Sequence, residues 1–348
     1  MHLPLFDQPL STGIQPRDYQ ADALDAVERS WEREPGALVR MATGLGKTVV
    51  GSLLAQRWLE RGDDYRVLVV SHEQQLIWQF AEEIGDILGD EPEIEMGQRQ
   101  ATGRALVTVA SRRTIYRITH PGVVCPKCLG LGGGESECDR CKDKGIAKPS
   151  LEDILDDPNS KSRLFKFDRH LNWLLLIDEA HRWSYGLREC APILQWFESN
   201  PNSRRVGLTA TPERSDGSTL EKMFPFVACD YRYYAPSGPC ALNDGWLVPY
   251  DQRFVSVEGV DFNNLKEVAG DFTDEELGEC LEQRETLASL INPTLEIVGN
   301  RSTLIFSPTV AVAKAVADQI KGDLGWGAAE SLEGSVLIET RKDVYKRL

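Results

Sequence analysis

The chain has 348 residues, 41% of them hydrophobic, which suffices for a packed core and suits two domains. Its net charge of −15 argues at first against a nucleic-acid-binding protein, which normally carries clustered positive charge. Membrane and secreted proteins are disfavoured, because no apolar run approaches about 18 residues and residues 1–14 do not resemble a secretory signal. The cytoplasm is therefore the expected compartment.

The first segment with a chemical signature is the string MATGLGKT at residues 41–48. It follows GALVRM, which predicts a buried β-strand, and a helix is predicted to begin near Lys47. The two glycines would let the backbone approach phosphates, Lys47 would reach the β- and γ-phosphates, and Thr48 would offer a hydroxyl to Mg²⁺. The strict phosphate-loop pattern has glycine where this chain has Met41, so a chance glycine-rich turn is the alternative. The predicted ATP-binding residues here are Thr43, Gly44, Leu45, Gly46, Lys47 and Thr48.

A cysteine-rich segment at 119–150 follows the predicted strand VTVAS at 107–111. It contains C-P-K-C, nine further residues and then C-D-R-C, a spacing that favours a structural Zn²⁺ held by four thiolates. The pattern also resembles zinc knuckles of chaperone type. A redox dithiol or disulfides are the alternatives, and the insert could contact DNA, a partner protein or neither. The predicted zinc ligands are Cys125, Cys128, Cys138 and Cys141.

The string IDEAH at 177–181 follows the apolar run Trp173 to Ile177, so its carboxylates would emerge from a buried strand. Asp178 is placed to hold Mg²⁺, and Glu179 to orient or deprotonate an attacking water. His181 would be a coupling residue rather than a core histidine. With Lys47, these three residues form the predicted catalytic set.

A third string, LTATP at 208–212, follows the strand-like run RRVGL. All three strings would then lie at the carboxyl ends of parallel strands, where α/β sheets bind their ligands. The predicted fold is therefore α/β with a doubly wound parallel sheet.

Negative charge is concentrated in one later segment. Between Glu258 and Glu296 there are eleven acidic and two basic residues, and apolar residues recur at helical spacing. This pattern predicts a solvated helical connector. Basic residues gather elsewhere, in SRRTIYR at 111–117 and KSRLFKFDR at 161–169, which weakens the objection that net charge raises against nucleic-acid binding.

In this order, the three strings resemble those of the superfamily 2 helicases and translocases of DEAH type. The nearest group resembles the type III restriction motor subunits and related phage and repair helicases. Further strings are similar to that family's motifs: PRDYQ at 16–20 to the Q motif, VVSHEQQL at 69–76 to motif Ia, VTVAS to motif Ib and LIFSPTVAVAKAVAD at 304–318 to motif IV.

The resemblance assigns expected roles to several residues. Gln20 would pair with adenine, and Arg17 would support it. Ser71, Ser111 and Arg112 would contact the phosphates of a nucleic-acid strand. Motif III, with Thr209, Ala210 and Thr211, would couple ATP state to the grip on that strand.

The resemblance implies a RecA-like P-loop NTPase lobe with a zinc-knuckle insertion and an incomplete second RecA-like lobe. The expected parts are a tail at 1–14, lobe one at 15–236 with the insertion at 119–150, a linker with acidic helices at 237–299, and part of lobe two at 300–348. TLIFSPTV would be a strand of lobe two, followed by a helix, and SLEGSVLIETRKDVYKRL would supply the second strand and its following helix. Motifs V and VI are missing, so the chain is interpreted as a fragment of a longer enzyme.

The expected function is that of an ATP-dependent helicase or translocase with ATP, Mg²⁺ and structural Zn²⁺. Its partner would be nucleic acid, DNA rather than RNA, in repair, recombination, replication or restriction, with no membrane role. A nuclease or repair partner, an RNA helicase, and an ATP- and nucleic-acid-binding module without hydrolysis stay open as alternatives.

Overall fold

The computed structural model describes residues 14–119, 123–124, 146–147, 150–213, 219–255, 267–268 and 271–347. The chain divides into two compact units, the first ending at Pro249 and the second beginning at Tyr250. The first unit thus continues beyond the predicted lobe boundary at residue 236, because the segment Cys240–Leu247 packs back onto it. None of the described helices is both long and apolar enough to cross a membrane.

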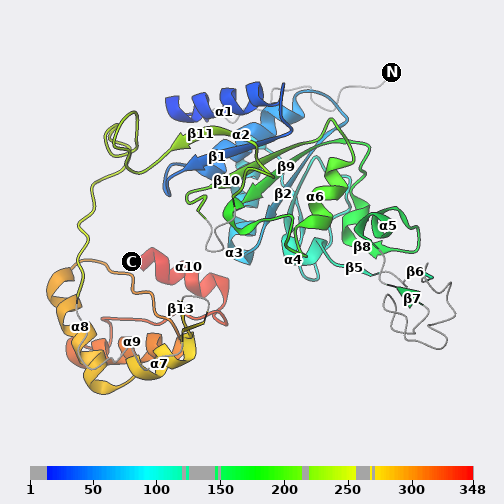
Figure 1. The fold of residues 1–348 in the computed structure, drawn as a ribbon. Helices are drawn as coiled ribbons and strands as arrows, with labels where there is room; N and C mark the ends of the chain where they lie inside the picture. The colour runs from blue at the N-terminus through cyan, green and yellow to red at the C-terminus, as the bar shows by residue number, and fades with distance from the viewer. Residues whose placement is uncertain are drawn as a thin grey trace. The chain divides into compact units, whose positions relative to one another are not determined.

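The first unit is built on a seven-stranded sheet in which every neighbouring pair is parallel, in the order β11-β1-β10-β9-β2-β4-β3 (Figure 1). The expected parallel α/β fold is therefore confirmed, and it is consistent with a RecA-like lobe. The strands are β1 (Gly36–Met41), β2 (Tyr65–Ser71), β3 (Glu93–Glu95), β4 (Val107–Ser111), β9 (Asn172–Asp178), β10 (Arg204–Thr209) and β11 (Phe226–Tyr231).

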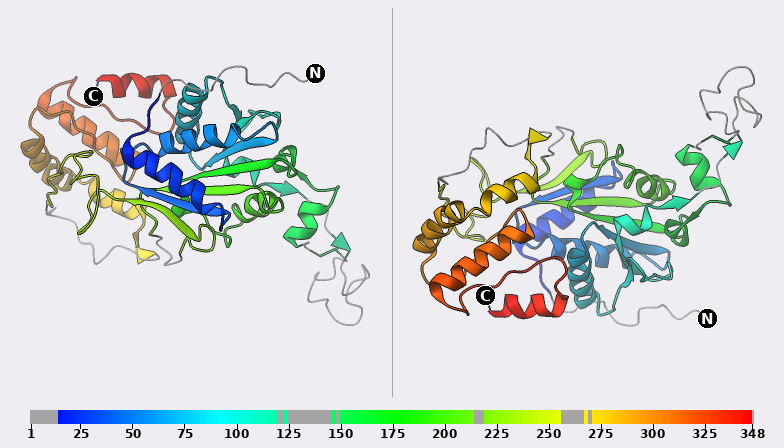
Figure 2. Two further views of the ribbon diagram at one scale, coloured as in Figure 1. Left: turned by 90° about the horizontal axis from the view of Figure 1, so that it is seen from above. Right: turned by 90° about the horizontal axis from the view of Figure 1, so that it is seen from below.

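Alternate residues of the central strands enter separate hydrophobic clusters on the two faces of the sheet. In β2, Val67 and Val69 face one cluster, while Leu68 and Val70 face the other. Because both faces are buried, these strands read as continuous apolar runs. Helices α1 (Asp18–Ser30), α2 (Lys47–Leu59) and α3 (Gln74–Leu88) contribute to the first cluster, and α4 (Arg112–Ile115), η1 (Arg163–Lys166) and α6 (Ala191–Glu198) to the second. Figure 2 shows the dark-blue α1 crossing one face.

Two short antiparallel strand pairs flank the four predicted zinc ligands in the sequence. β5 (Ile118–Thr119) pairs antiparallel with β8 (Lys161–Ser162), and β6 (Val123–Val124) pairs with β7 (Ile146–Ala147). Helix α5 (Leu151–Asp156) follows. The four predicted zinc ligands lie outside the described residues. Within the described ranges, no group of three or more histidine, cysteine or acidic residues could hold a metal ion. The zinc knuckle therefore remains a prediction.

The second unit is mainly helical in its described part. Leu287 and Ile291 of α8 pack with Val312, Val316 and Ile320 of α9 in a small core. Its elements are β12 (Glu267–Val268), β13 (Asp271–Phe272), α7 (Asp274–Leu281), α8 (Arg284–Val298), α9 (Val310–Leu324) and α10 (Ile338–Arg347), with a loop at 299–309 between α8 and α9. Helices α7 and α8 occupy the acidic segment for which helices were predicted.

The prediction that TLIFSPTV and the first part of SLEGSVLIETRKDVYKRL are strands was wrong, whereas the helix predicted after the second strand is present as α10. Leu304, Ile305 and Phe306 lie in irregular backbone, and the Phe306 side chain is 87% exposed. SVLIET instead contains a turn and the first residues of α10. A β-strand needs a neighbour for its backbone hydrogen bonds, and in the described part of this unit only β12 and β13 pair with each other. A RecA-like sheet is therefore not present among the described residues of 300–348.

Candidate nucleotide-binding site

Three predicted site segments end at the same edge of the sheet. The register pairs Arg40 of β1 with Thr209 of β10, and Leu208 of β10 with Asp178 of β9. The phosphate loop, the IDEAH string and the LTATP string therefore follow adjacent strands in the order β1, β10, β9. This edge is where parallel α/β sheets place their ligands.

The loop at 42–46 has the backbone that close approach to phosphates requires. Gly44 and Gly46 have φ values of 88° and 76°, in the left-handed region that favours glycine. A Cβ atom at Gly46 would lie 2.7 Å from Nε2 of Gln20, so a larger residue cannot be placed there without a shift. Thr43 and Gly44 are exposed, while Leu45 is buried. The α2 N-terminus follows directly, with Thr48 half-buried as its second residue.

Met41, the departure from the strict pattern, has a structural role. It is the last residue of β1, and its side chain is fully buried in the core beneath α1 and α2. Its carbonyl oxygen accepts a hydrogen bond of 3.3 Å from Nζ of Lys47. Residue 41 therefore contacts Lys47 through its backbone carbonyl. Any residue type supplies that carbonyl, so glycine is not required at this position.

Lys47, Asp178 and Glu179 form the charged centre of the site. Burial lowers the pKa of Lys47, and the charges of Glu179 and Asp178 oppose that shift. Burial, and then the adjacent Glu179, raise the pKa of Asp178 to about 6. Oγ of Ser71 donates to Oδ2 of Asp178 over 3.2 Å. A buried carboxylate with a raised pKa beside a second carboxylate is the environment that a divalent cation relieves, so the donor set fits Mg²⁺.

Glu179 is held in an unusual conformation. It has a φ of 50° and a ψ of 54°, and it is the one residue other than glycine with positive φ in the described ranges. Such strain costs about 1–3 kcal/mol and occurs preferentially at functional sites. The turn of η2 (Ala180–Arg182) follows and returns His181 toward the neighbouring strand.

His181 joins the IDEAH string to the LTATP string. Its Nδ1 lies 3.2 Å from Oε2 of Glu179 and 3.0 Å from Oγ1 of Thr209. Thr209 is fully buried; its hydroxyl donates to the carbonyl of Thr211 over 3.0 Å and accepts from the amide of Thr211 over 3.2 Å. Ala210 lies between them and is half-buried. His181 therefore contacts both Glu179 and Thr209, and Thr209 is hydrogen-bonded to Thr211, so a change at Glu179 can reach Thr211 through these two side chains.

The predicted adenine-reading residues lie against the phosphate loop. Nε2 of Gln20 donates to the carbonyl of Leu45 over 2.9 Å, and Oε1 of Gln20 accepts from the amide of Arg17 over 2.9 Å. The second bond caps the start of α1, because a side chain three residues into the helix reaches back to the capping residue. Arg17 is exposed, and Gln20 is buried. The structure thus brings both residues to the same edge as Lys47.

The sequence of the chain also matches the model of a protein family. The model described as "Type III restriction enzyme, res subunit" matches residues 13–214, more than half of the chain. The chain belongs to this family. Its members are ATP-dependent helicases and ATPases, and the matched range contains the whole nucleotide edge described above. A comparison with curated proteins finds no match.

Several solved structures are similar to the chain at low identity. They include the UvsW helicase of bacteriophage T4 (16% identity, 62% of this chain and 60% of that one, TM-score 0.37). The Hef helicase domain of Pyrococcus furiosus matches with 19% identity over 89% of this chain and 54% of that one, TM-score 0.42. The SWI2/SNF2 ATPase core of Sulfolobus solfataricus in complex with dsDNA matches with 14% identity over 59% and 34%, TM-score 0.36. The chain thus spans about a third to three fifths of these structures.

The residues predicted to contact nucleic acid are largely buried in the first unit. Ser71 is fully buried with its hydroxyl on Asp178, and Ser111 is buried at the end of β4. The Arg112 side chain is 11% exposed; it donates to the carbonyl of Arg182 over 2.8 Å and pairs with Glu189 over 3.1 Å. The Arg112 contacts therefore hold the loop after IDEAH, and Ser71 holds Asp178, while the contact of all three residues with nucleic acid stays a prediction.

The first unit also has a basic groove that was not predicted from the sequence. The two basic segments of the sequence, 111–117 and 161–169, meet because β5 pairs with β8, and together they line a groove of about 620 Å³. Arg163 and Lys166 of this groove pair with the buried Glu95 over 2.8 Å and 2.7 Å. Its remaining cations are the exposed Arg113, Arg117 and Lys161. Basic flanks on both sides of an insertion were the signal that could have predicted this groove.

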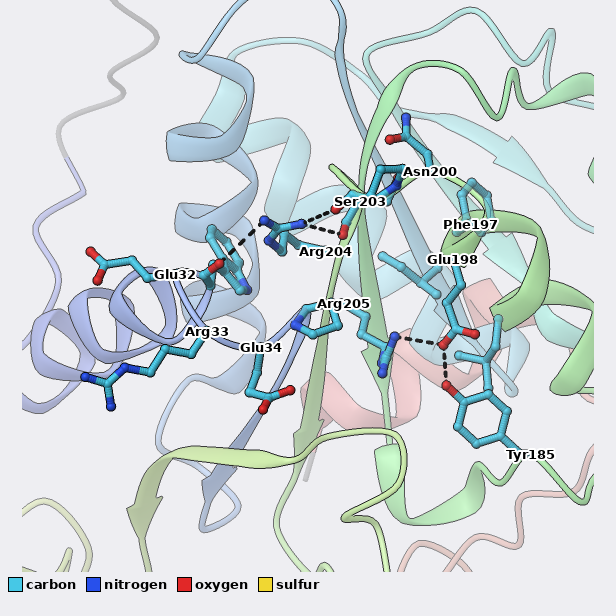
Figure 3. A pocket seen from close by; sticks show the side chains of 15 residues that line it. Glu32, Arg33, Glu34, Tyr185, Phe197, Glu198, Asn200, Ser203, Arg204 and Arg205 are labelled. Atoms are coloured by element: carbon cyan, nitrogen blue, oxygen red, sulfur yellow. Dashed lines mark hydrogen bonds and ion pairs between the residues drawn. The ribbon is translucent and has the colours of Figure 1, made fainter.

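A second cavity, of about 580 Å³, lies at the opposite edge of the sheet (Figure 3). It is lined by Pro35, just before β1, and by Ser203 and Arg204, at the start of β10. Glu198 accepts a hydrogen bond of 2.8 Å from Arg205 and another from the hydroxyl of Tyr185. This cavity contains none of the predicted site residues.

Proposed function

We propose that this protein uses ATP hydrolysis to move along nucleic acid, with DNA as the preferred track. The proposal rests mainly on the meeting of Lys47, Asp178 and Glu179 at one edge of the sheet, where Nδ1 of His181 lies 3.2 Å from Glu179 and 3.0 Å from Thr209. A site for nucleotide alone would need no such connection between the acidic centre and a neighbouring strand. A motor needs one, because ATP state must change its grip on the track.

Each residue of the site has its own role in the proposed binding and hydrolysis of ATP. Lys47 and the amides of the 43–48 loop would hold the phosphates, and Thr48 and Asp178 would hold Mg²⁺, which would supply positive charge to the transferring phosphoryl group. Glu179 accepts the proton of the attacking water. Gln20 and Arg17 hold the adenine. Loss of the γ-phosphate then changes the hydrogen bonds of Glu179 and His181, and Thr209 and Thr211 pass that change to the strand-binding side.

The groove lined by Arg113, Arg117 and Lys161 supports nucleic acid as the partner. None of these three cations pairs with a carboxylate in the described part of the chain, whereas the net charge of the whole chain is −15. Positive charge concentrated in one groove of an acidic protein favours a phosphate backbone over other partners. The groove lies on the first unit, beside the motif Ib strand β4.

We expect the Arg113→Ala/Arg117→Ala chain to bind duplex DNA more weakly than the wild type. The slope of log K against log salt concentration should fall by about 2, because each phosphate contact releases roughly one counterion. Fluorescence anisotropy with single-stranded DNA, duplex DNA and RNA, each with and without a non-hydrolysable ATP analogue, measures affinity and its dependence on nucleotide.

The matched control is Arg33→Ala/Lys222→Ala, which removes two exposed cations that do not line the groove. It should leave the salt slope within experimental error of the wild type. An equal loss in both double variants would contradict a specific groove. Tighter binding of RNA than of either DNA would favour the RNA-helicase alternative, and affinities insensitive to the ATP analogue would favour a binding module that is not a motor.

A further inference from the structure

The segment Cys240–Leu247, which follows β11, is fixed to the first unit by its backbone. The amides of Trp246 and Leu247 both donate to the carbonyl of Ala241, over 2.9 and 3.0 Å. The amide of Ala241 donates to the carbonyl of Arg232 over 2.9 Å, and the Ala241 side chain is buried in the core beneath α1. The turn therefore presents Trp246 in a defined position.

That position is against the predicted adenine-reading residues. The guanidinium of Arg17 lies over the Trp246 ring, 4.8 Å from its centroid. The Trp246 ring also meets Tyr19 edge-on, with centroids 5.3 Å apart, and Tyr19 stacks on Tyr231 at 4.7 Å with the rings 3° from parallel. Four side chains from α1, β11 and the turn thus form one stack beside the phosphate loop.

The stack is linked to the phosphate loop by hydrogen bonds and by packing. Nη1 of Arg17 donates to the hydroxyl of Tyr19 over 3.1 Å, and that hydroxyl donates to the carbonyl of Leu45 over 3.1 Å. A methyl group of Leu247 lies 3.3 Å from where a Cβ atom of Gly44 would be. A displacement of Trp246 would therefore directly change the position of the Arg17 guanidinium.

We propose that Trp246 is a positioning residue for the base of the bound nucleotide: its indole holds the Arg17 guanidinium flat at the edge where Gln20 reads the base. A guanidinium is planar and stacks on aromatic faces, so with one face on indole its other face is available to a purine. The free arginine side chain is otherwise long and mobile, and Arg17 has only the Tyr19 hydroxyl as a further side-chain partner in the described structure. The inference rests on ATP being the ligand of this edge.

The test is the affinity of the full chain for ATP, GTP and inorganic tripolyphosphate, each with Mg²⁺, measured by competition against a fluorescent ATP analogue. In Trp246→Ala, the Kd for ATP should rise about 3- to 30-fold, the range that corresponds to loss of a partly desolvated cation–π contact. The Kd for tripolyphosphate, which has no base, should stay unchanged, and the ratio of ATP to GTP affinity should fall toward one. Trp246→Phe should restore most of the ATP affinity.

A double-variant cycle separates positioning from direct contact. If Trp246 acts through Arg17, then Arg17→Ala/Trp246→Ala should bind ATP no more weakly than Arg17→Ala alone. The control Trp326→Ala removes an indole that is 92% exposed, in the second unit, and should bind as the wild type does. Unchanged ATP affinity in Trp246→Ala, an equal loss for tripolyphosphate, or additive losses in the cycle would each overturn the inference. A wild-type chain that binds tripolyphosphate but not ATP would overturn it as well, whereas one that binds neither would overturn the proposed function itself.

Discussion

Replacing Lys47 by alanine should nearly abolish ATP·Mg²⁺ binding while leaving the fold intact. Lys47 is the half-buried cation that faces the phosphate-binding backbone, with the Asp178 and Glu179 carboxylates nearby. Truncating one partner of a buried, hydrogen-bonded charge pair costs about 2–5 kcal/mol, so the Kd should rise roughly 30-fold or more. Among the described residues, the Lys47 ammonium donates one hydrogen bond, of 3.3 Å, to the carbonyl oxygen of Met41. Titration with a fluorescent ATP analogue measures the loss.

Lys222→Ala is the matched control for this variant, because Lys222 is an exposed lysine outside the site. It should bind the analogue as the wild type does. The far-ultraviolet circular dichroism and thermal midpoint of Lys47→Ala should be close to those of the wild type. Wild-type affinity in Lys47→Ala would mean that the 43–48 loop is not the phosphate site.

Replacing Trp173 by alanine should destabilise the first unit by about 3–5 kcal/mol, a large share of the roughly 5–15 kcal/mol that stabilises a typical domain. Trp173 is fully buried on β9, where its ring meets Phe167 and Phe197 edge-on at 5.6 and 5.4 Å. Its Nε1 donates to the carbonyl of Asp168 over 2.7 Å. Urea unfolding followed by far-ultraviolet circular dichroism should show an earlier midpoint. ATP binding should be lost over the same urea range, because β9 ends at Asp178.

Trp173→Phe should cost less than Trp173→Ala, since a ring still fills most of the space, and the losses are the Nε1 hydrogen bond and the volume of the second ring. Trp326→Ala, at a site that is 92% exposed, should change stability by no more than about 0.5 kcal/mol. A Trp173→Ala chain with the wild-type midpoint would contradict the placement of β9 in the centre of the packed sheet.

The sequence predicted which loops meet at one edge of the sheet, because the signals for them are local. An apolar run followed by glycines or carboxylates identifies both a buried strand and the loop after it, and parallel strands bring such loops to one edge. The same logic failed for residues 303–310. TLIFSPTV has the composition of a strand, but a strand also depends on a hydrogen-bonding neighbour, which its own sequence does not reveal.

The contacts of the basic residues could not be predicted from local signals. Arg112 lies in a basic segment after a motif strand, yet the residues that engage it, Arg182 and Glu189, are about 70 or more positions away. Arg113, its neighbour, points into the groove instead. Trp246 was missed for the same reason, because it meets Arg17 only through the folding of the chain after β11.

Hydrogen exchange measured by mass spectrometry, with and without ATP·Mg²⁺, would locate the nucleotide, because it reports on both edges of the sheet at once. We expect slower exchange at residues 42–48 and 178–181, with smaller protection at 17–20 and 240–247. Protection confined to residues 31–35 and 194–205, which line the cavity in Figure 3, would place the ligand at the opposite edge. That result, or no protection in any of these segments at saturating ATP·Mg²⁺, would contradict the assignment of the nucleotide site.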